Sequence, residues 1–277
     1  MLEIPEATTI ARQLNETLAG RRVKQVITGH SPHKFAWFHG EPHGYHDLLH
    51  GRVLEGAEAP GGKIDVQFGA VHLLFGDGVA LRHHAPGDKL PDKHQLLVVF
   101  DDNSALSGSV QMYGGLWCFR EGEFDNWYYN VARAKPSPLS PGFDTGYFAA
   151  LIQSPAAQRL SAKAFLATEQ RIPGFGNGVL HDTLYNARIH PKRKINTLGE
   201  HDADTLYSSL KQTLAEMTVA GGRDTEKDLF GALGGYKSKL SSKSHGQPCP
   251  LCGHLFCKEA YLGGTIYYCP ECQPLLA

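Results

Sequence analysis

The sequence predicts an α+β multidomain protein with an N-terminal β-sandwich, a helical domain and a C-terminal β-hairpin zinc finger. Three observations predict this class. Short β-type runs separated by turn residues fill residues 23–119, the hydrophobic period becomes helical after residue 142, and two Cys-x-x-Cys pairs lie near the C-terminus. A length of 277 residues favours two domains, or three if the cysteine-bearing segment counts as one.

The N-terminal region combines one helix with a set of strands. Residues Glu6–Ala19 carry apolar side chains at helical spacing and stop at Gly20, which predicts a long N-terminal helix. The clearest strand candidates are Ile64–Phe68, Val71–Phe75 and Leu96–Phe100. Because such runs recur regularly with turn signals between them, we assign residues 1–134 to the β-sandwich.

A Pro- and Ser-rich linker at residues 134–142 separates the sandwich from a helical domain, residues 135–236. The predicted helices are residues 146–153, 155–168, 177–186, 201–220 and 225–232. Between two of them, the glycines of Gln170–Asn177 permit a tight turn that exposes backbone amides at a helix start, which is a ready anion site. This arrangement is typical of nucleic-acid binding, although glycine-rich helix connections are also common elsewhere.

Four cysteines have the spacing of a structural zinc site. Cys249 and Cys252 form one pair, and Cys269 and Cys272 form a second pair after sixteen intervening residues. Two such pairs place four thiolates around one metal ion, so we assign residues 237–277 to a zinc finger with one structural Zn²⁺. Two disulfides are the disfavoured alternative, because unpaired thiols beside a metal set indicate a reducing compartment.

The charge and hydropathy of the sequence limit which cellular compartment and which kind of binding partner we expect. The net charge of −1 and the pI near 6.9 argue against indiscriminate polyanion binding. Basic clusters at Arg188–Lys194 and Lys237–Lys243 still allow one basic groove, and solvated surface faces explain each cluster equally well. The first residues lack a signal peptide and no apolar run is long enough to span a membrane, so we expect a cytoplasmic protein.

Three segments, in this order, resemble the formamidopyrimidine-DNA glycosylase and endonuclease VIII family. They are the start Met1–Glu6, the turn Ile172–Asn177 followed by Ile189–Pro191, and the tail Pro248–Gln273. Because the segments lie at both ends and in the middle, the resemblance covers the whole chain. It implies a β-sandwich, a helical domain with a helix–two-turn–helix motif, a zinc finger, and DNA held in the cleft between the two larger domains.

The resemblance implies catalytic roles near the start of the chain. In the family, the mature N-terminal proline attacks C1′ of the damaged nucleotide and forms a Schiff base, and the following Glu moves protons. Glu3 occupies the position of that Glu, while Leu2 and Met1 stand where the attacking amine is expected. Lys63 matches a lysine that contacts phosphate and assists the reaction.

The resemblance also implies contacts with DNA. The damaged base is flipped out of the duplex, side chains fill the gap, and other groups grip the backbone. The matching positions in this chain are His94, Gln111, Tyr113, Arg159, Lys163, Gly176 and Asn177. The implied partner is double-stranded DNA that contains a lesion or an abasic site.

The first departure from the family pattern concerns the attacking amine. Leu2 replaces the proline, although a primary amine also forms an imine. Methionine is generally retained before a side chain as large as leucine. A retained Met1 displaces the free amine by one residue, or about 3.3–3.6 Å in extended chain.

Other departures concern phosphate and gap-filling residues. Gly264 lies in the segment where the family has a phosphate-binding arginine, and Gln111 and Met112 align with two further arginines. The intercalating methionine of the family falls on Gly78, which leaves Tyr113 as a candidate wedge. The backbone grip is thus retained, while the imine former and much of the gap-filling set are not.

Two functions from different classes fit this pattern. The leading hypothesis is a base-excision repair glycosylase that acts on damaged or modified bases through Glu3, with weak or absent strand cleavage. The alternative is a non-catalytic binder of damaged or altered DNA that has lost the attacking amine. RNA binding, and full lyase activity through the Met1 amine or Lys63, remain open. We expect a monomer without membrane association that works in the cytoplasm at the nucleoid.

Overall fold

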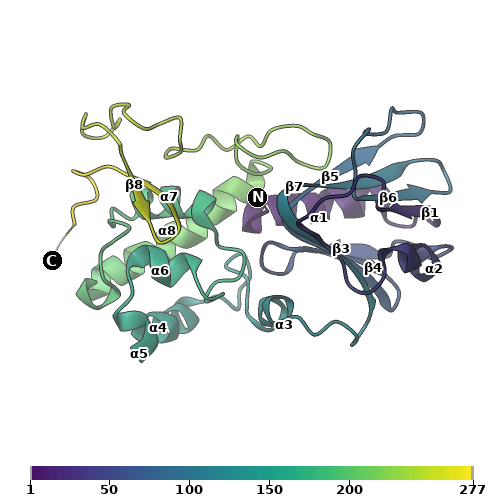
Figure 1. The fold of residues 1–277 in the computed structure, drawn as a ribbon. Helices are drawn as coiled ribbons and strands as arrows, with labels where there is room; N and C mark the ends of the chain where they lie inside the picture. Colours follow the sequence, from purple (N-terminus) through teal and green to yellow (C-terminus); the bar gives the residue numbers. More distant parts are fainter. Residues whose placement is uncertain (1, 276–277) are drawn as a thin grey trace. The chain divides into compact units, whose positions relative to one another are not determined.

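The chain folds into two units, each assembled from two separate stretches of sequence (Figure 1). The computed structural model describes residues 2–275. The first unit contains Met1–Asn130 and Ala220–Gly235, and the second contains Val131–Val219 and Tyr236–Ala277. Residues 220–235 therefore fold with the N-terminal strands. The division into three domains at residues 134 and 236 stays a prediction.

Helix α1 (Ile4–Leu18, purple in Figure 1) opens the first unit and confirms the predicted N-terminal helix. Pro5 lies in its first turn, where a missing N–H costs no hydrogen bond, and the chain leaves the helix through Gly20 at φ 83°. Its buried face includes Ile10 and Leu14, which join the core of the strands that follow. Burial of this apolar stripe anchors the start of the chain against the sheet.

The strands of the first unit form one continuous hydrogen-bonded ladder in the order β1-β6-β7-β5-β4-β3. They are β1 (Val23–Thr28), β2 (Ala36–Trp37), β3 (Gly56–Glu58), β4 (Ile64–Phe68), β5 (Val71–His84), β6 (Leu96–Phe100) and β7 (Ala105–Arg120). Neighbours on this path are antiparallel, and β2 pairs parallel to β7 off the path. Short helical segments α2 (Tyr45–Leu49), η1 (Pro42–Gly44) and η2 (Pro60–Gly62) connect them.

The long strands β5 and β7 turn this ladder into a sandwich. Their pairing shifts register between Asp77 and Val79, and such a bulge bends a strand. Before the bulge β5 pairs with β4, and beyond it β7 pairs with β6, so the two halves share one core cluster with α1. At Gly78 a Cβ atom would lie 2.5 Å from the Tyr113 carbonyl oxygen, so the bulge accepts only glycine.

The second unit is mainly helical. Its helices are α4 (Thr145–Gln153), α5 (Pro155–Gln158), α6 (Ala162–Ala167), α7 (Asn177–Asn186), η3 (Ile195–Thr197) and α8 (Glu200–Val219). Its hairpin consists of β8 (Cys257–Tyr261) and β9 (Gly264–Tyr268), and α3 (Trp127–Ala134) spans the sequence boundary between the units. The predicted α+β class, with a sandwich, a helical part and a C-terminal hairpin, is confirmed.

Two predictions about helices were wrong, and one helix was missed. Residues 155–168 form two helices, because the Ser161 hydroxyl accepts a hydrogen bond from the Ala164 amide and starts α6 anew. Residues 225–232 form turns, since the Asp228 carboxylate accepts from the Phe230 and Ala232 amides and Gly231 has φ 85°. Helix α3 was not predicted at all.

Within residues 2–275, the helices are all too short or too polar to cross a membrane.

Candidate active site and cysteine cluster

A group of buried charges lies at the start of α1. The Glu6 carboxylate accepts two hydrogen bonds from the Arg223 guanidinium, at 2.9 Å from Nε and 3.0 Å from Nη2, and a third from the Arg223 amide at 3.1 Å. Nη1 of the same guanidinium lies 3.7 Å from Oε2 of Glu3. Exposed fractions are only 5% for Glu3, 4% for Glu6 and 4% for Arg223. We call these three residues the charge cluster.

The charges of this cluster stabilise one another. Burial alone lowers the pKa of Arg223, but the charges of Glu3 and Glu6 outweigh that cost and raise its pKa above the ordinary value. Glu3 precedes the first turn of α1 and Glu6 lies within it, where the helix dipole favours negative charge. Two carboxylates share one guanidinium, so the cluster carries a net negative charge suited to moving protons.

The segment that supplies Arg223 is held at several points. The side chain of Gln13 donates to the Asp228 carboxylate at 2.8 Å and accepts from the Leu229 amide at 3.1 Å. Nη1 of Arg82 donates to the Asp228 carbonyl at 2.7 Å, and Leu229 is buried in the sandwich core. These contacts join residues 220–235 to α1 and β5, so Arg223 is presented by a supported loop.

A cavity of about 350 Å³ opens beside the charge cluster. Its walls come from α1, the bulge of β5, the middle of β7 and residues 225–233. They include Leu2, Glu6, Gly78, Arg82, Gln111, Met112, Tyr113, Thr225, Glu226 and Lys227. The mixture of apolar walls and a few charged groups is typical of a small-molecule site, and the volume admits a flat heterocycle.

Leu2 and Lys63 each lie against β5. The Leu2 amide donates to the Asp77 carbonyl at 3.1 Å, and Cγ of Lys63 faces Gly76. Lys63 is 7% exposed, and burial lowers the pKa of its ammonium although the charge of Asp77 opposes this. An amine with a lowered pKa is a better nucleophile at neutral pH. Met1, the other predicted amine, lies outside the described residues.

The other predicted residues of the first unit have different environments. Gln111 is exposed, and the ring of Tyr113 lies 5.7 Å from that of Trp37. His94 is buried and stacks on His30 at 4.5 Å, and burial lowers its pKa, which favours a neutral imidazole. Its Nδ1 lies 3.1 Å from the Pro91 carbonyl oxygen. Its role as a basic DNA contact stays a prediction.

Lys163 and Asn177 meet at the turn of the β8–β9 hairpin. Nζ of Lys163 donates to the Tyr261 carbonyl at 2.6 Å, and Nδ2 of Asn177 donates to the Thr265 carbonyl at 2.7 Å. Between these carbonyls, a Cβ on Gly264 would lie 3.3 Å from the Lys163 amine. The structure therefore brings two predicted phosphate ligands together at the position where the family arginine is missing.

Gly176 and Arg159 flank this pair in sequence. Gly176 has an extended backbone and is the N-cap residue of α7. Because glycine has no side chain, it makes no capping hydrogen bond to the amides of the first turn. Arg159 is exposed after α5, and its carbonyl accepts from Lys194 at 3.1 Å. A helix start and an exposed cation are suited to anions, and the role of Gly176 and Arg159 in DNA binding stays a prediction.

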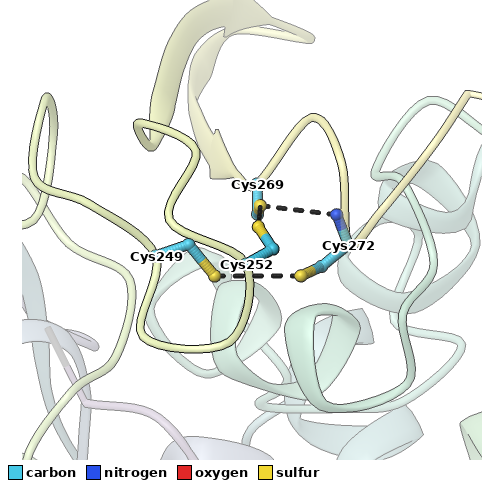
Figure 2. A group of neighbouring side chains, drawn as sticks. All are labelled: Cys249, Cys252, Cys269 and Cys272. Atoms are coloured by element: carbon cyan, nitrogen blue, oxygen red, sulfur yellow. Dashed lines mark hydrogen bonds between the residues drawn. The ribbon is translucent and has the colours of Figure 1, made fainter.

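The four paired cysteines converge on one point (Figure 2). Their sulfur atoms all lie within 4.8 Å of one another, with 3.8 Å between Cys249 and Cys272 and 3.4 Å between Cys252 and Cys269. The Tyr185 hydroxyl lies 3.1 Å from the sulfur of Cys249. Four thiolates at these distances can hold one metal ion.

The cysteine cluster is tied to the helices of its unit. The buried Gln273 side chain accepts from the Cys269 amide and donates to the Ile189 carbonyl, both at 2.9 Å. Tyr185, Phe256 and Tyr267 pack with two of the cysteines in a small apolar cluster. The hairpin is therefore fixed to α7 by both polar and apolar contacts.

Glu6 and Arg223 were missed by the sequence analysis. Glu6 carries a local signal, because it follows Glu3 by three residues at the start of a helix. Arg223 carries none, since 217 residues separate it from Glu6 and its neighbours resemble an ordinary polar loop.

Known proteins resemble the whole chain, although no protein-family model matches it. The formamidopyrimidine-DNA glycosylase of Symbiobacterium thermophilum is 28% identical over 281 aligned residues, covering 99% of this chain and 90% of the relative. That of Thermus thermophilus is 29% identical over 288, covering 99% and 98%. The crystal structure of Lactococcus lactis Fpg with abasic-site-containing DNA superposes with a TM-score of 0.82 and 20% identity, covering 98% and 99%.

The similarity extends from the first helix to the cysteine hairpin, with the same fold over nearly the full length of both chains. The resemblance carried by the three motifs is thereby confirmed. Over nearly its whole length, the chain is therefore similar to formamidopyrimidine-DNA glycosylases in sequence and to Fpg structures in fold.

Proposed function

We propose that this protein is a DNA glycosylase of base-excision repair that releases a damaged base from double-stranded DNA. One observation carries the proposal. Glu3, at the family's catalytic Glu position, is a buried carboxylate paired with Arg223, and its neighbours Leu2 and Glu6 line a cavity of about 350 Å³. The names of the relatives support the same activity.

The proposed reaction is hydrolysis of the N-glycosyl bond. The damaged nucleotide leaves the base stack, and its base enters the cavity. Glu3 removes a proton from a water molecule whose oxygen bonds to C1′. The bond from C1′ to the base breaks, and the base nitrogen keeps the electron pair and takes up a proton. Only a deprotonated Glu3 can accept the proton of the attacking water.

Strand cleavage requires an amine that forms an imine with C1′. Leu2 replaces the family proline, and we propose that cleavage is weak or absent for this reason. Lys63, directly before β4, is the remaining candidate amine, because it is buried and its pKa is lowered by burial. Any residual imine is therefore assigned to Lys63 rather than to the start of the chain.

Lys163 and Asn177 are the proposed ligands of the DNA backbone. Both side chains end close to Gly264. Because glycine has no side chain, no arginine at this position lies between their polar groups and a bound phosphate. The Lys163 amine has further donors beyond the one used by the Tyr261 carbonyl. Tyr113, beside Trp37 and the exposed Met112, is the proposed wedge for the gap in the duplex.

The proposed metal is one structural Zn²⁺ on the four cysteines. A Zn–S bond of about 2.3 Å requires sulfurs about 3.8 Å apart in a tetrahedron. The separations of 3.8 Å for Cys249 and Cys272 and 3.4 Å for Cys252 and Cys269, with all four sulfurs within 4.8 Å, lie around this value, which supports this ion. When bound, the metal holds the hairpin in shape and takes no part in the reaction. A glycosylase of this kind works at the chromosome, which we place in the cytoplasm at the nucleoid.

Base release tests the activity. Duplexes that each carry one oxidised purine or one oxidised pyrimidine are incubated with excess protein, and alkali then reveals base loss. Glu3→Gln is expected to lower release by about a hundredfold or more. Glu16→Gln is the matched control, because Glu16 lies on the same helix but is exposed and paired with Arg12.

The competing function is a non-catalytic binder of damaged DNA. The departures at Leu2, Gln111 and Gly264 favour it. Tight binding to lesion duplexes, together with no Glu3-dependent release on any of them, would replace the glycosylase by the binder. Borohydride trapping on abasic DNA, followed by mass spectrometry of the adducted peptide, shows whether an imine forms on Lys63.

The backbone ligands are tested by DNA affinity. Lys163→Ala is expected to weaken binding evenly across sequences and to reduce the salt dependence by about one charge, since it contacts phosphate. Asn177→Ala is expected to weaken binding without changing the salt dependence. Lys89→Ala, on an exposed loop, is the control. A loss that depends on base sequence would contradict the assignment.

A further inference from the structure

Arg223 makes an unequal set of contacts with two carboxylates. Its Nε and Nη2 form a forked pair with Glu6, which leaves Nη1 directed at Glu3, 3.7 Å away. The planar guanidinium therefore fixes the position of Glu3 relative to Glu6. A lysine at this site could supply the charge but not the fork.

The backbone before Arg223 is shaped for this contact. Gly221 and Gly222 have φ of 76° and 100°, a region that favours glycine. A Cβ on Gly222 would lie 3.5 Å from the Glu6 side chain, and one on Gly234 would lie 2.2 Å from the Gly222 carbonyl oxygen. The turn therefore packs closely against the Glu6 side chain. In this conformation the Arg223 amide also donates a hydrogen bond to the Glu6 carboxylate.

The groups around Glu3 determine its charge. Glu6 on α1 and Glu226, 4.0 Å from Nη2 of Arg223, are negative, while Arg223 is the buried cation that contacts Glu3. Asp77 on β5, whose carbonyl accepts from the Leu2 amide, and Lys63 before β4 carry one charge of each sign and act on one another. An opposite charge at this range lowers a carboxyl pKa by about 1–3 units, whereas a like charge or burial raises it. Without Arg223, burial and Glu6 would both favour protonated Glu3.

We propose that Arg223 is a positioning residue that keeps Glu3 deprotonated, so that Glu3 serves as the base and not as the acid of the reaction. The ionisation of Glu3 follows from the charge cluster itself, while its part in base release rests on the proposed glycosylase function. The segment 220–235 thus contributes to proton transfer without contacting the sugar.

The ionisation of Glu3 is measured directly by ¹³C NMR of the side-chain carboxyls across a pH titration. The Glu3 signal is assigned as the one missing from Glu3→Gln. Arg223→Met is expected to raise the Glu3 pKa by about 1–3 units. Glu6→Gln removes a like charge and is expected to lower it. If Arg223→Met does not fold, Glu6→Gln and Arg223→Lys still test the cluster, and an unchanged Glu3 pKa in Glu6→Gln overturns the inference.

The role as a base is measured by the pH profile of base release under single turnover. In wild type the rate falls as Glu3 becomes protonated at low pH. In Arg223→Met this fall is expected about 1–3 pH units higher, with Arg223→Lys in between. Gln13→Leu is the matched control, because Gln13 holds the same segment through Asp228 and Leu229 without contacting Glu3. The rate of base release is expected to change in Gln13→Leu because the loop is held less firmly. The pH at which this rate falls is expected to be the same as in wild type.

The two measurements separate the two proposals. A shifted Glu3 pKa with no base release by wild type on any lesion rejects the glycosylase and retains the charge cluster. Base release with an unshifted profile in Arg223→Met overturns the role of Arg223, while the glycosylase stands. If the pH profile of base release shifts equally in Arg223→Met and Gln13→Leu, Arg223 only supports the loop, and the inference is overturned.

Discussion

The charge cluster and the cysteine cluster hold their polar groups together in opposite ways. The charge cluster joins residues that lie 217 positions apart, and its buried cation and carboxylates stabilise one another. The cysteine cluster draws four like groups from residues 249–272, and thiolates this close together repel unless a cation lies between them. The first cluster balances charge with charge, whereas the second is an arrangement that a metal ion can hold together.

This difference teaches where each unit is vulnerable. Loss of the ion should affect only the second unit, because the core of the first unit is a continuous apolar cluster that includes α1 and the strands. Loss of a buried charge should affect only the first unit, because the remaining partners stay buried and uncompensated. The following changes test that contrast, from the largest expected effect to the smallest.

Cys249→Ser should release the metal and unfold the hairpin region. Structural zinc supplies about 10–16 kcal/mol of binding free energy to such segments, more than any single contact in the first unit. Metal content by mass spectrometry and limited proteolysis measure the effect, and the strands of the first unit should stay protected. Cys257→Ser is the control, since Cys257 lies in β8 outside the four-cysteine set. Retained metal in Cys249→Ser would contradict the contrast.

Arg223→Met should destabilise the first unit by about 3–5 kcal/mol, because it leaves two carboxylates buried without their cation. Urea unfolding followed by tryptophan fluorescence measures the change. Arg12→Met, on α1, is the matched control, since the Arg12–Glu16 pair is exposed and should contribute about 0–1 kcal/mol. Equal losses in both variants would mean that burial of the charge cluster does not matter.

Lys63→Met should stabilise the first unit at neutral pH while it impairs any imine chemistry. Burial lowers the pKa of Lys63 from 10.5, so in the folded state the charged amine is disfavoured. In the window between the lowered pKa and 10.5 the unfolded chain binds more protons, and wild-type stability rises with pH there. The advantage of Lys63→Met should therefore be full below that window and disappear above it. Thermal unfolding at several pH values measures this, and a pH-independent difference would refute the cause.

Tyr185→Phe should have the smallest effect. It removes one hydroxyl that lies 3.1 Å from the Cys249 sulfur, a contact that contributes about 1 kcal/mol. Competition with a chelator should show slightly weaker metal retention in the variant, with the fold unchanged. Tyr207→Phe, on α8 and away from the cysteines, is the control. Complete metal loss in Tyr185→Phe would show that the four thiolates alone do not define the site.

Features encoded by short sequence separations were predictable. The cysteine spacing indicated a common metal site, the predicted helix 177–186 has the bounds of α7, and the runs Ile64–Phe68 and Leu96–Phe100 are β4 and β6. For the cysteines, the short chain between them limits the distance between their side chains. For the helix and the strands, the hydrophobic period indicates which face is buried. The resemblance to the family, and with it the assignment proposed for Glu3, followed from motifs of the same local kind.

Only the tertiary structure decided what surrounds Glu3. Arg223, the bulge at Gly78 and the meeting of Lys163 with the hairpin turn all depend on which distant segments pack together. Residues 225–232 carry helical periodicity, yet the Asp228 carboxylate and the anchoring of Leu229 in the sandwich core hold them in turns. Local pattern sets what a segment can form, whereas the charge and shape of a site come from contacts between segments that the chain order does not bring together.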